Sequence, residues 1–174
     1  MEETNCYDNF PAWMALLATA VTLAIYGIGA YILVGFSIII AILYLLYCLW
    51  IEQRVLRRSC VNCFYYGKTC GLGRGKLCSV LFEKGDPQRF AAAEISWTAI
   101  LPDFLVFIIP LVGGIILIMM AFTWLLVALV ALFAILAFGG TAVIRGSFAC
   151  KYCKQREIGC PAERLFSKEE THHE

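Results

Sequence analysis

Two long apolar stretches constrain the fold of this chain more than any other feature. Residues 11–51 contain no Asp, Glu, Lys or Arg, and residues 96–143 contain only Asp103. A helix needs about 20 apolar residues to cross a bilayer, so each stretch is long enough for two crossings and a tight turn. Only 16% of the chain is charged, against about 25% in soluble domains. We therefore predict an all-α integral membrane protein with four transmembrane helices.

The four helices are expected to form two hairpins, at residues 11–52 and 98–144. The expected helix bounds are about 11–29, 31–52, 97–119 and 122–143. Because glycine readily breaks a helix, Gly27, Gly29 and Gly35 are all candidates for the first turn. Pro102 and Pro110 lie inside the third helix, where each removes a hydrogen bond and should kink or divide it. Paired glycines at 113–114 and 139–140 should let neighbouring helices approach closely.

The distribution of basic residues predicts the orientation. All 14 Lys and Arg residues lie in two segments, 52–97 and 145–174, and the hairpin turns carry none. Pairs of crossings place these segments and the N-terminus on one side of the membrane. Basic residues near helix ends are held on the cytoplasmic side. We therefore expect both termini in the cytoplasm, with the protein in a plasma or inner membrane.

The same cysteine pattern, C-x2-C-x6-C, follows each hairpin. Its two copies are Cys60, Cys63 and Cys70, and Cys150, Cys153 and Cys160, offset by 90 residues at every position. The hairpins align with the same offset, so the chain is interpreted as two tandem repeats. Tandem repeats with an even number of crossings predict a pseudo-two-fold axis along the membrane normal. The two cysteine modules would then face each other below the bundle.

The remaining segments differ in composition. They are an acidic N-terminal segment (1–10), a cysteine-rich loop (53–86), an interfacial helix (87–97), a second cysteine-rich module (145–162) and a flexible polar tail (163–174). Asp86 is expected to cap the interfacial helix, with Pro87 at its first position. Gly71, Gly73 and Gly75 lack the spacing of a phosphate-binding loop, so they predict an irregular structural turn.

Eight of the nine cysteines are predicted on one face of the membrane, and Cys48 lies inside a helix. Thiols in the reducing cytoplasm are more typical of metal ligands than of disulfides. Two C-x2-C turns can complete a tetrahedral S4 site, which favours zinc or iron. In a local arrangement the two sites are Cys60, Cys63, Cys70 and Cys78, and Cys150, Cys153, Cys160 and Cys6. In a shared arrangement both C-x2-C pairs form one site, and Cys70 and Cys160 remain as a separate pair.

The cysteine modules resemble zinc-ribbon and rubredoxin-like knuckles in their local spacing, over about a tenth of the chain. Two zinc ions would be structural and would contribute to the free energy of folding. Iron–sulfur clusters would instead make the protein a membrane-bound electron carrier. Thiol–disulfide chemistry without any metal is a further alternative.

These features favour a structural or assembly subunit whose metal sites order the cytoplasmic face for a protein partner. Electron transfer through iron–sulfur clusters is the alternative. The third hypothesis is a small transporter that uses Asp103, because an ionisable residue within an apolar helix indicates a site. No catalytic constellation is recognised, and both histidines lie in the tail. Orientation and anionic lipid explain the basic face without nucleic acid. The expected partners are the bilayer and a protein, and the chain could also form a homo-oligomer.

Overall fold

A computed structural model of the protein describes residues 6–92 and 97–160, and the regular structure of these residues is helical apart from one isolated β-bridge. The long helices are α1 (Ala12–Val34), α2 (Ile38–Arg58), α5 (Trp97–Met120), and a continuous helix over 124–149 that contains α6 (Trp124–Ala134), α7 (Thr141–Val143) and the π-helical segments Ile135–Gly140 and Ile144–Ala149. The short helices are a 3-10 turn (Cys60–Asn62), α3 (Arg74–Leu81), α4 (Pro87–Ala92) and α8 (Lys154–Gly159).

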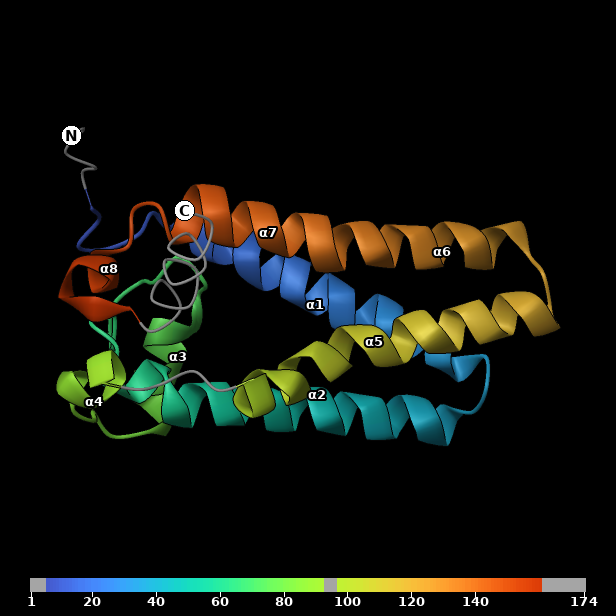
Figure 1. Ribbon diagram of the computed structural model, residues 1–174, viewed down its shortest axis with the longest axis horizontal. Coiled ribbons are helices and arrows are strands. Elements are labelled where there is room, and N and C mark those ends of the chain that lie inside the picture. Colours follow the sequence, from blue (N-terminus) through green and yellow to red (C-terminus); the bar gives the residue numbers. More distant parts are fainter. Residues whose placement is uncertain (1–5, 93–96, 161–174) are drawn as a thin grey trace, which may run out of the picture.

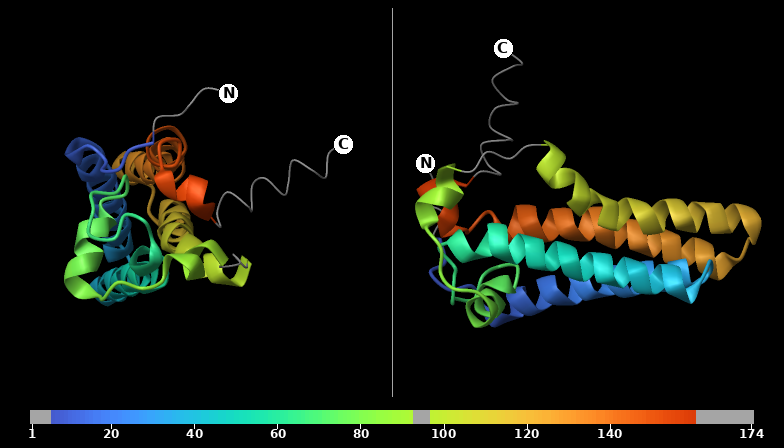
Figure 2. Two further views of the ribbon diagram at one scale, coloured as in Figure 1. Left: turned by 90° about the vertical axis from the view of Figure 1, so that its left-hand side faces the viewer. Right: turned by 90° about the horizontal axis from the view of Figure 1, so that it is seen from below.

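Four of the helices are long and apolar enough to cross a membrane, as predicted. They lie side by side, with α3, α4 and α8 gathered at one end and the hairpin turns at the other (Figure 1). The end-on view in Figure 2 shows the four helices as one bundle. Helix α1 packs against α2, α5 and α6, and α5 also packs against α2 and α6.

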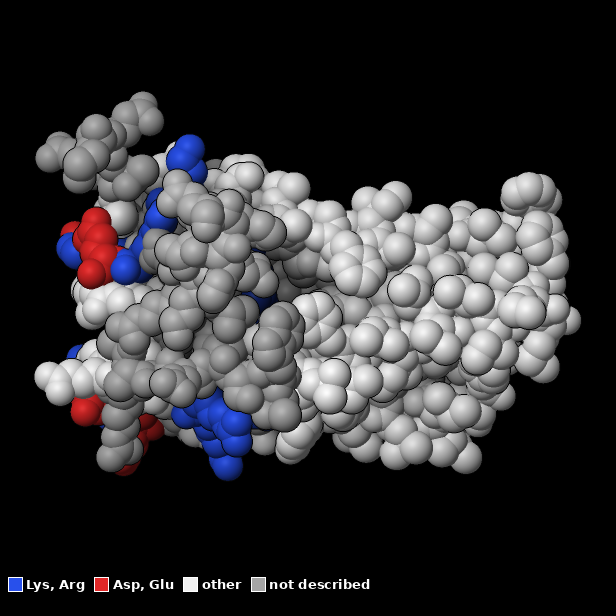
Figure 3. Space-filling view, viewed as in Figure 1, with Lys and Arg blue, Asp and Glu red and all other residues white. Residues whose placement is uncertain are grey.

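Charge is confined to the end of the bundle that carries the short helices (Figure 3). We call the loops and short helices at this end the cap, which comprises residues 6–10, 59–92 and 150–160. Along the rest of the bundle, large apolar side chains such as Leu16, Leu23 and Met119 are exposed. Burying them in lipid removes this apolar surface from water, so the chain is an integral membrane protein in contact with the bilayer.

The first hairpin turns later than the expected helix bounds of 29 and 31, and of the three candidate glycines it is Gly35 that lies at the turn. Helix α1 continues to Val34, and α2 begins after Ser37, whose Oγ accepts a hydrogen bond from the Ile39 N–H at 3.3 Å. Helix α2 then runs past the predicted end at residue 52. Gly29 lies inside α1, and a Cβ atom there would lie 2.7 Å from the Tyr44 hydroxyl of α2. This glycine therefore permits α1 and α2 to pack closely.

Helix α5 is continuous, so of the two expected effects of its prolines, a kink or a division, the division is wrong. Pro110 has no N–H to pair with the Val106 carbonyl. The Tyr44 hydroxyl of α2 donates to that carbonyl at 3.0 Å, and the Tyr47 hydroxyl donates to the Pro102 carbonyl at 2.8 Å. Tyr44 thus supplies the donor that Pro110 lacks, and Tyr47 adds a second hydrogen bond between α2 and α5.

Of the two predicted glycine pairs, the first brings helices together. A Cβ atom at Gly114 would lie 2.5 Å from Val130 Cγ2, so α5 and α6 approach closely there. A Cβ atom at Gly139 would meet no atom within 4 Å, and Gly139 and Gly140 lie in a π-helical segment instead. The predicted close approach at Gly139 is therefore wrong.

The interfacial helix begins as predicted. Asp86 Oδ1 accepts a hydrogen bond from the Gln88 N–H at 2.9 Å, and Pro87 is the first residue of α4. The expected continuation from α4 into the third membrane helix falls on residues 93–96, outside the described residues. The polar tail at 163–174 also lies outside them.

Candidate thiol site in the cap

The N-terminal segment joins the two cysteine modules in the cap. The Tyr7 N–H donates to the Tyr152 carbonyl at 3.1 Å, and the Phe10 N–H donates to the Thr69 carbonyl at 2.9 Å. Phe10 is buried and its ring packs against Tyr65, with ring centroids 5.3 Å apart. Residues 6–10 therefore contact both modules at once.

A reciprocal pair of hydrogen bonds links the two modules directly. Gln155 Oε1 accepts the Phe64 N–H at 2.8 Å, and the Tyr65 hydroxyl accepts the Lys154 N–H at 3.0 Å. Tyr65 and Gln155 are 90 residues apart, as are Phe64 and Lys154. Each module therefore offers a side-chain oxygen to the equivalent backbone N–H of the other. Tyr65 and Gln155 are each only 2% exposed, so these bonds lie in the interior of the cap.

The two C-x2-C turns share a backbone hydrogen bond and differ in ψ at the second cysteine, 150° at Cys63 and 116° at Cys153. The Cys63 N–H donates to the Cys60 carbonyl and the Cys153 N–H donates to the Cys150 carbonyl, each at 3.3 Å. Cys63 and Cys153 have φ values of −86° and −87°. The shared spacing thus gives the same hydrogen bond in both modules.

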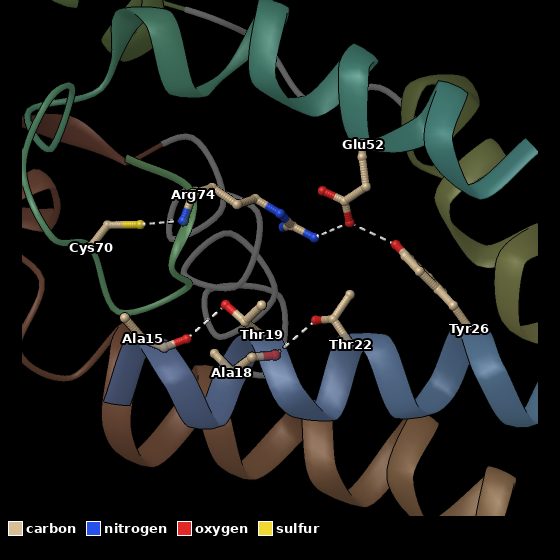
Figure 4. Close-up of polar contacts among 8 residues, drawn as sticks. All are labelled: Ala15, Ala18, Thr19, Thr22, Tyr26, Glu52, Cys70 and Arg74. Carbon is tan, nitrogen blue, oxygen red and sulfur yellow. Dashed lines mark hydrogen bonds and ion pairs between the residues drawn. The ribbon is translucent and has the colours of Figure 1, made fainter. Parts of the chain in front are cut away.

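Backbone N–H groups point at several of the sulfur atoms. Cys70 Sγ accepts hydrogen bonds from the N–H groups of Arg74 and Gly75, each at 3.2 Å, in the first turn of α3 (Figure 4). The first N–H groups of a helix have no partner within the helix, so they are free to bind an acceptor. Hydrogen bonds to a sulfur favour its thiolate form.

Burial opposes ionisation of the unliganded thiols. It raises the pKa of Cys63, the N–H of Tyr65 counteracts part of this rise, and the nearby Cys70 thiol raises the pKa further. Burial likewise raises the pKa of Cys153 to about 12, against a partial opposing effect from the Gln155 N–H. These thiols are neutral at pH 7, and a bound cation would be needed to convert them to thiolates.

The first four predicted ligands lie in one neighbourhood of the cap. Cys60 is within electrostatic reach of Cys70, Cys78 and Cys63. Cys78 is fully buried, and its thiol makes a weak contact with the Leu56 carbonyl at 3.8 Å. The loop of residues 59–78 therefore brings these four thiols into one region of the cap, without drawing them together around a single point.

The second four predicted ligands are more dispersed. Cys153 is near both Cys150 and Cys63, and Cys160 is near Cys63 in the other module. The Cys6 thiol donates to a Glu157 carboxylate oxygen at 3.3 Å. Within residues 6–92 and 97–160, no three Cys, His, Asp or Glu side chains converge closely enough to hold a metal ion.

Asp103, the third predicted site, lies near the start of α5 and faces α2. Its Oδ1 atom is 3.4 Å from Arg54 Nη1, and its side chain is 43% exposed. An arginine from the neighbouring helix therefore offsets the charge of this carboxylate at the cap end of the bundle.

Sequence reasoning missed an ionic contact between the cap and the bundle. Arg74 reaches from the start of α3 to Glu52 on α2, and the same Glu52 oxygen accepts the Tyr26 hydroxyl of α1 at 2.7 Å (Figure 4). Burial alone would lower the pKa of Arg74, but Glu52 more than offsets this effect and the net pKa is raised. A glutamate at the end of an apolar helix indicates that an ionic partner is needed. The sequence does not identify that partner, because Arg74 is 22 residues away in the glycine-rich loop.

Comparisons with protein-family models, curated proteins and solved structures found no match for this chain. The geometry of the cap and of the bundle is therefore the basis for a function.

Proposed function

We propose that this integral membrane protein binds metal through the cysteines of its cap, and that the metal orders this face for a protein partner in the cytoplasm. The observation that carries the proposal is the environment of Cys70. Its sulfur accepts two backbone hydrogen bonds and lies near Cys60, Cys63 and Cys78. Backbone donors arranged around grouped thiols favour thiolate ligands of a closed tetrahedral site.

The first site consists of Cys60, Cys63, Cys70 and Cys78. Four thiolates and one divalent cation carry a net negative charge, which nearby cations offset. Arg74 is within electrostatic reach of Cys60, and the Lys68 ammonium lies 3.9 Å from the Phe64 ring centroid, beside Cys63. Zinc is the proposed ion because tetrahedral thiolate coordination is its ordinary structural mode, and the four cysteines would have to draw together around it.

The second site uses Cys150, Cys153, Cys160 and Cys6. The matched C-x2-C turns support it, because each has a hydrogen bond from the N–H of its second cysteine to the carbonyl of its first. The hydrogen bond from the Tyr7 N–H to Tyr152 supports a role for Cys6, since it holds the N-terminal segment beside this module. Closure of the site would require the three cysteines of the module to draw together around the ion.

The tandem repeat and its pseudo-two-fold axis are part of the same proposal. The reciprocal bonds of Tyr65 and Gln155 support it, because a two-fold axis exchanges equivalent donors and acceptors. The central positions of α1 and α5 in the bundle also support it, since these helices are equivalent in the two repeats.

Iron–sulfur clusters on the same thiols are the alternative, because hydrogen bonds to sulfur also tune the potential of such clusters. Transport through Asp103 is the less favoured hypothesis, since Arg54 neutralises this residue at the end of the bundle.

Cys78→Ser tests the local arrangement of ligands. Cys78 is a ligand only in that arrangement, so its loss should remove about half of the bound zinc. Cys48→Ser is the matched control, because Cys48 is equally buried but lies in the membrane bundle. Zinc per chain is measured by elemental analysis on protein with an unchanged elution volume in detergent. Full zinc retention by Cys78→Ser would contradict the local arrangement.

A further inference from the structure

A surface pocket of about 370 Å³ lies where α2 enters the cap, beside the start of α5. Its lining residues are Trp50, Gln53, Arg54, Arg57, Arg58 and Pro102. Five of the six come from the last turns of α2. This lining contains three arginines and no acidic side chain, so the pocket is cationic.

The five lining residues of α2 lie on one face of the helix. Their spacing of three and four residues repeats the helical turn. The same face continues toward the hairpin turn with Leu46, Leu43 and Ile39, which are all exposed. A basic pocket thus adjoins an apolar track on the same helix. Charged side chains gather at this end of the bundle, and the rest of the visible surface carries none (Figure 3).

Neighbouring groups hold two of the arginines in place. Arg54 pairs with Asp103 at 3.4 Å and lies 5.9 Å from the Trp50 ring centroid. Arg57 lies 5.2 Å from the Phe82 ring centroid. Since Asp103 is engaged by Arg54, the exposed guanidinium groups of Arg57 and Arg58 supply the cationic charge that faces outward from the pocket.

We propose that this pocket binds the phosphate headgroup of an anionic phospholipid, with an acyl chain lying along Leu46 and Leu43. Guanidinium groups bind phosphate oxygens in a bidentate fork, and basic side chains at headgroup depth attract anionic lipids. The apolar track favours a lipid over free phosphate, because phosphate alone would make no use of it. This site is independent of the cap cysteines.

The test is binding of dioleoyl phosphatidylglycerol to the full-length protein in nonionic detergent, measured by native mass spectrometry. The wild type should bind it more tightly than dioleoyl phosphatidylcholine, which has the same chains and no net charge. Arg57→Gln with Arg58→Gln should weaken binding by about 25-fold, at roughly fivefold per arginine. Lys76→Gln with Lys84→Gln is the control. Both lysines are exposed in the cap, and these substitutions remove the same amount of charge outside the pocket.

The control pair should leave the affinity within about twofold of the wild type, well below the effect of the two arginines. Equal weakening by both pairs would overturn the proposal, because it would indicate diffuse attraction to the whole basic cap. Displacement of the lipid by millimolar inorganic phosphate, or equal binding of dihexanoyl phosphatidylglycerol, would overturn the role of the apolar track. Partial recovery of binding in Arg57→Lys with Arg58→Lys, in protein that elutes normally, would support the proposal, because lysine keeps the charge without the bidentate fork.

Discussion

At the scale of single residues, the Tyr65 hydroxyl makes two hydrogen bonds to other segments of the cap. It accepts the Lys154 N–H and donates to the Tyr7 carbonyl, so it joins three segments. Tyr65→Phe should destabilise the cap by about 1–3 kcal/mol, because it leaves buried backbone groups without a partner. Hydrogen exchange at the Lys154 amide should accelerate accordingly.

Tyr66→Phe is the control for this prediction. The Tyr66 hydroxyl donates to the Phe82 carbonyl at 2.7 Å, within the first module alone. Its loss should leave exchange at Lys154 unchanged. Equal acceleration in both variants would show that Tyr65 does not link the modules.

The ion pair between Arg74 and Glu52 gives a second prediction at this scale. Both side chains are largely shielded, at 19% and 22% exposure. Arg74→Met should destabilise the protein by about 2–4 kcal/mol, because Glu52 keeps its charge without its partner. Arg74→Met combined with Glu52→Met should recover much of the loss. Unfolding in mixed micelles measures the cycle, and strictly additive effects would contradict the pairing.

At the scale of elements, the glycine-rich loop is shaped to lie against α1. Gly73 has φ of +76°, and a Cβ atom there would lie 2.4 Å from Thr19 Oγ1. Gly73→Ala should therefore displace the loop and destabilise the protein by about 1–3 kcal/mol. Gly27→Ala is the control, because Gly27 is helical with no atom near the added methyl group, and it should stabilise by up to about 1 kcal/mol. If Gly73→Ala lowered the free energy of unfolding by less than Gly27→Ala does, this account of the loop would be contradicted.

The elements differ in how far the sequence predicted them. The membrane helices follow from the apolar stretches, and the N-terminus of α4 follows from Asp86 and Pro87, because both signals are local. The first turn was misplaced because Gly29 serves packing against Tyr44, which depends on tertiary contacts that local propensity does not contain. The continuity of α5 was missed for the same reason, since Tyr44 on another helix supports the carbonyl that Pro110 leaves free.

The candidate site divides in the same way. The order of apolar stretches and cysteines predicted that the cysteines lie at one end of the bundle, and the equivalence of the two modules stays a prediction. The contact between Tyr65 and Gln155 could not be predicted, because neither residue carries a motif. Its signal is the equivalence of positions 65 and 155, which is visible only once the modules are superposed along the sequence.

At the scale of the whole molecule, the proposed orientation places the cap in the cytoplasm and both hairpin turns on the opposite side. Cysteines introduced as Phe36→Cys and Thr123→Cys lie at these turns. A membrane-impermeant maleimide added to intact cells should label them, whereas wild-type protein and Ser79→Cys in the cap should react only after permeabilisation. Labelling of Ser79→Cys alone in intact cells would reverse the orientation.

The central claim is that the cap thiols hold metal, and elemental analysis of anaerobically purified protein, with a visible spectrum, tests it most directly. We predict about two zinc ions per chain and no visible absorbance, because tetrathiolate zinc is closed-shell and colourless. Iron with matching sulfide and a brown colour would replace zinc with clusters on the same ligands. Absence of any metal would contradict the claim and leave eight cysteines as free thiols.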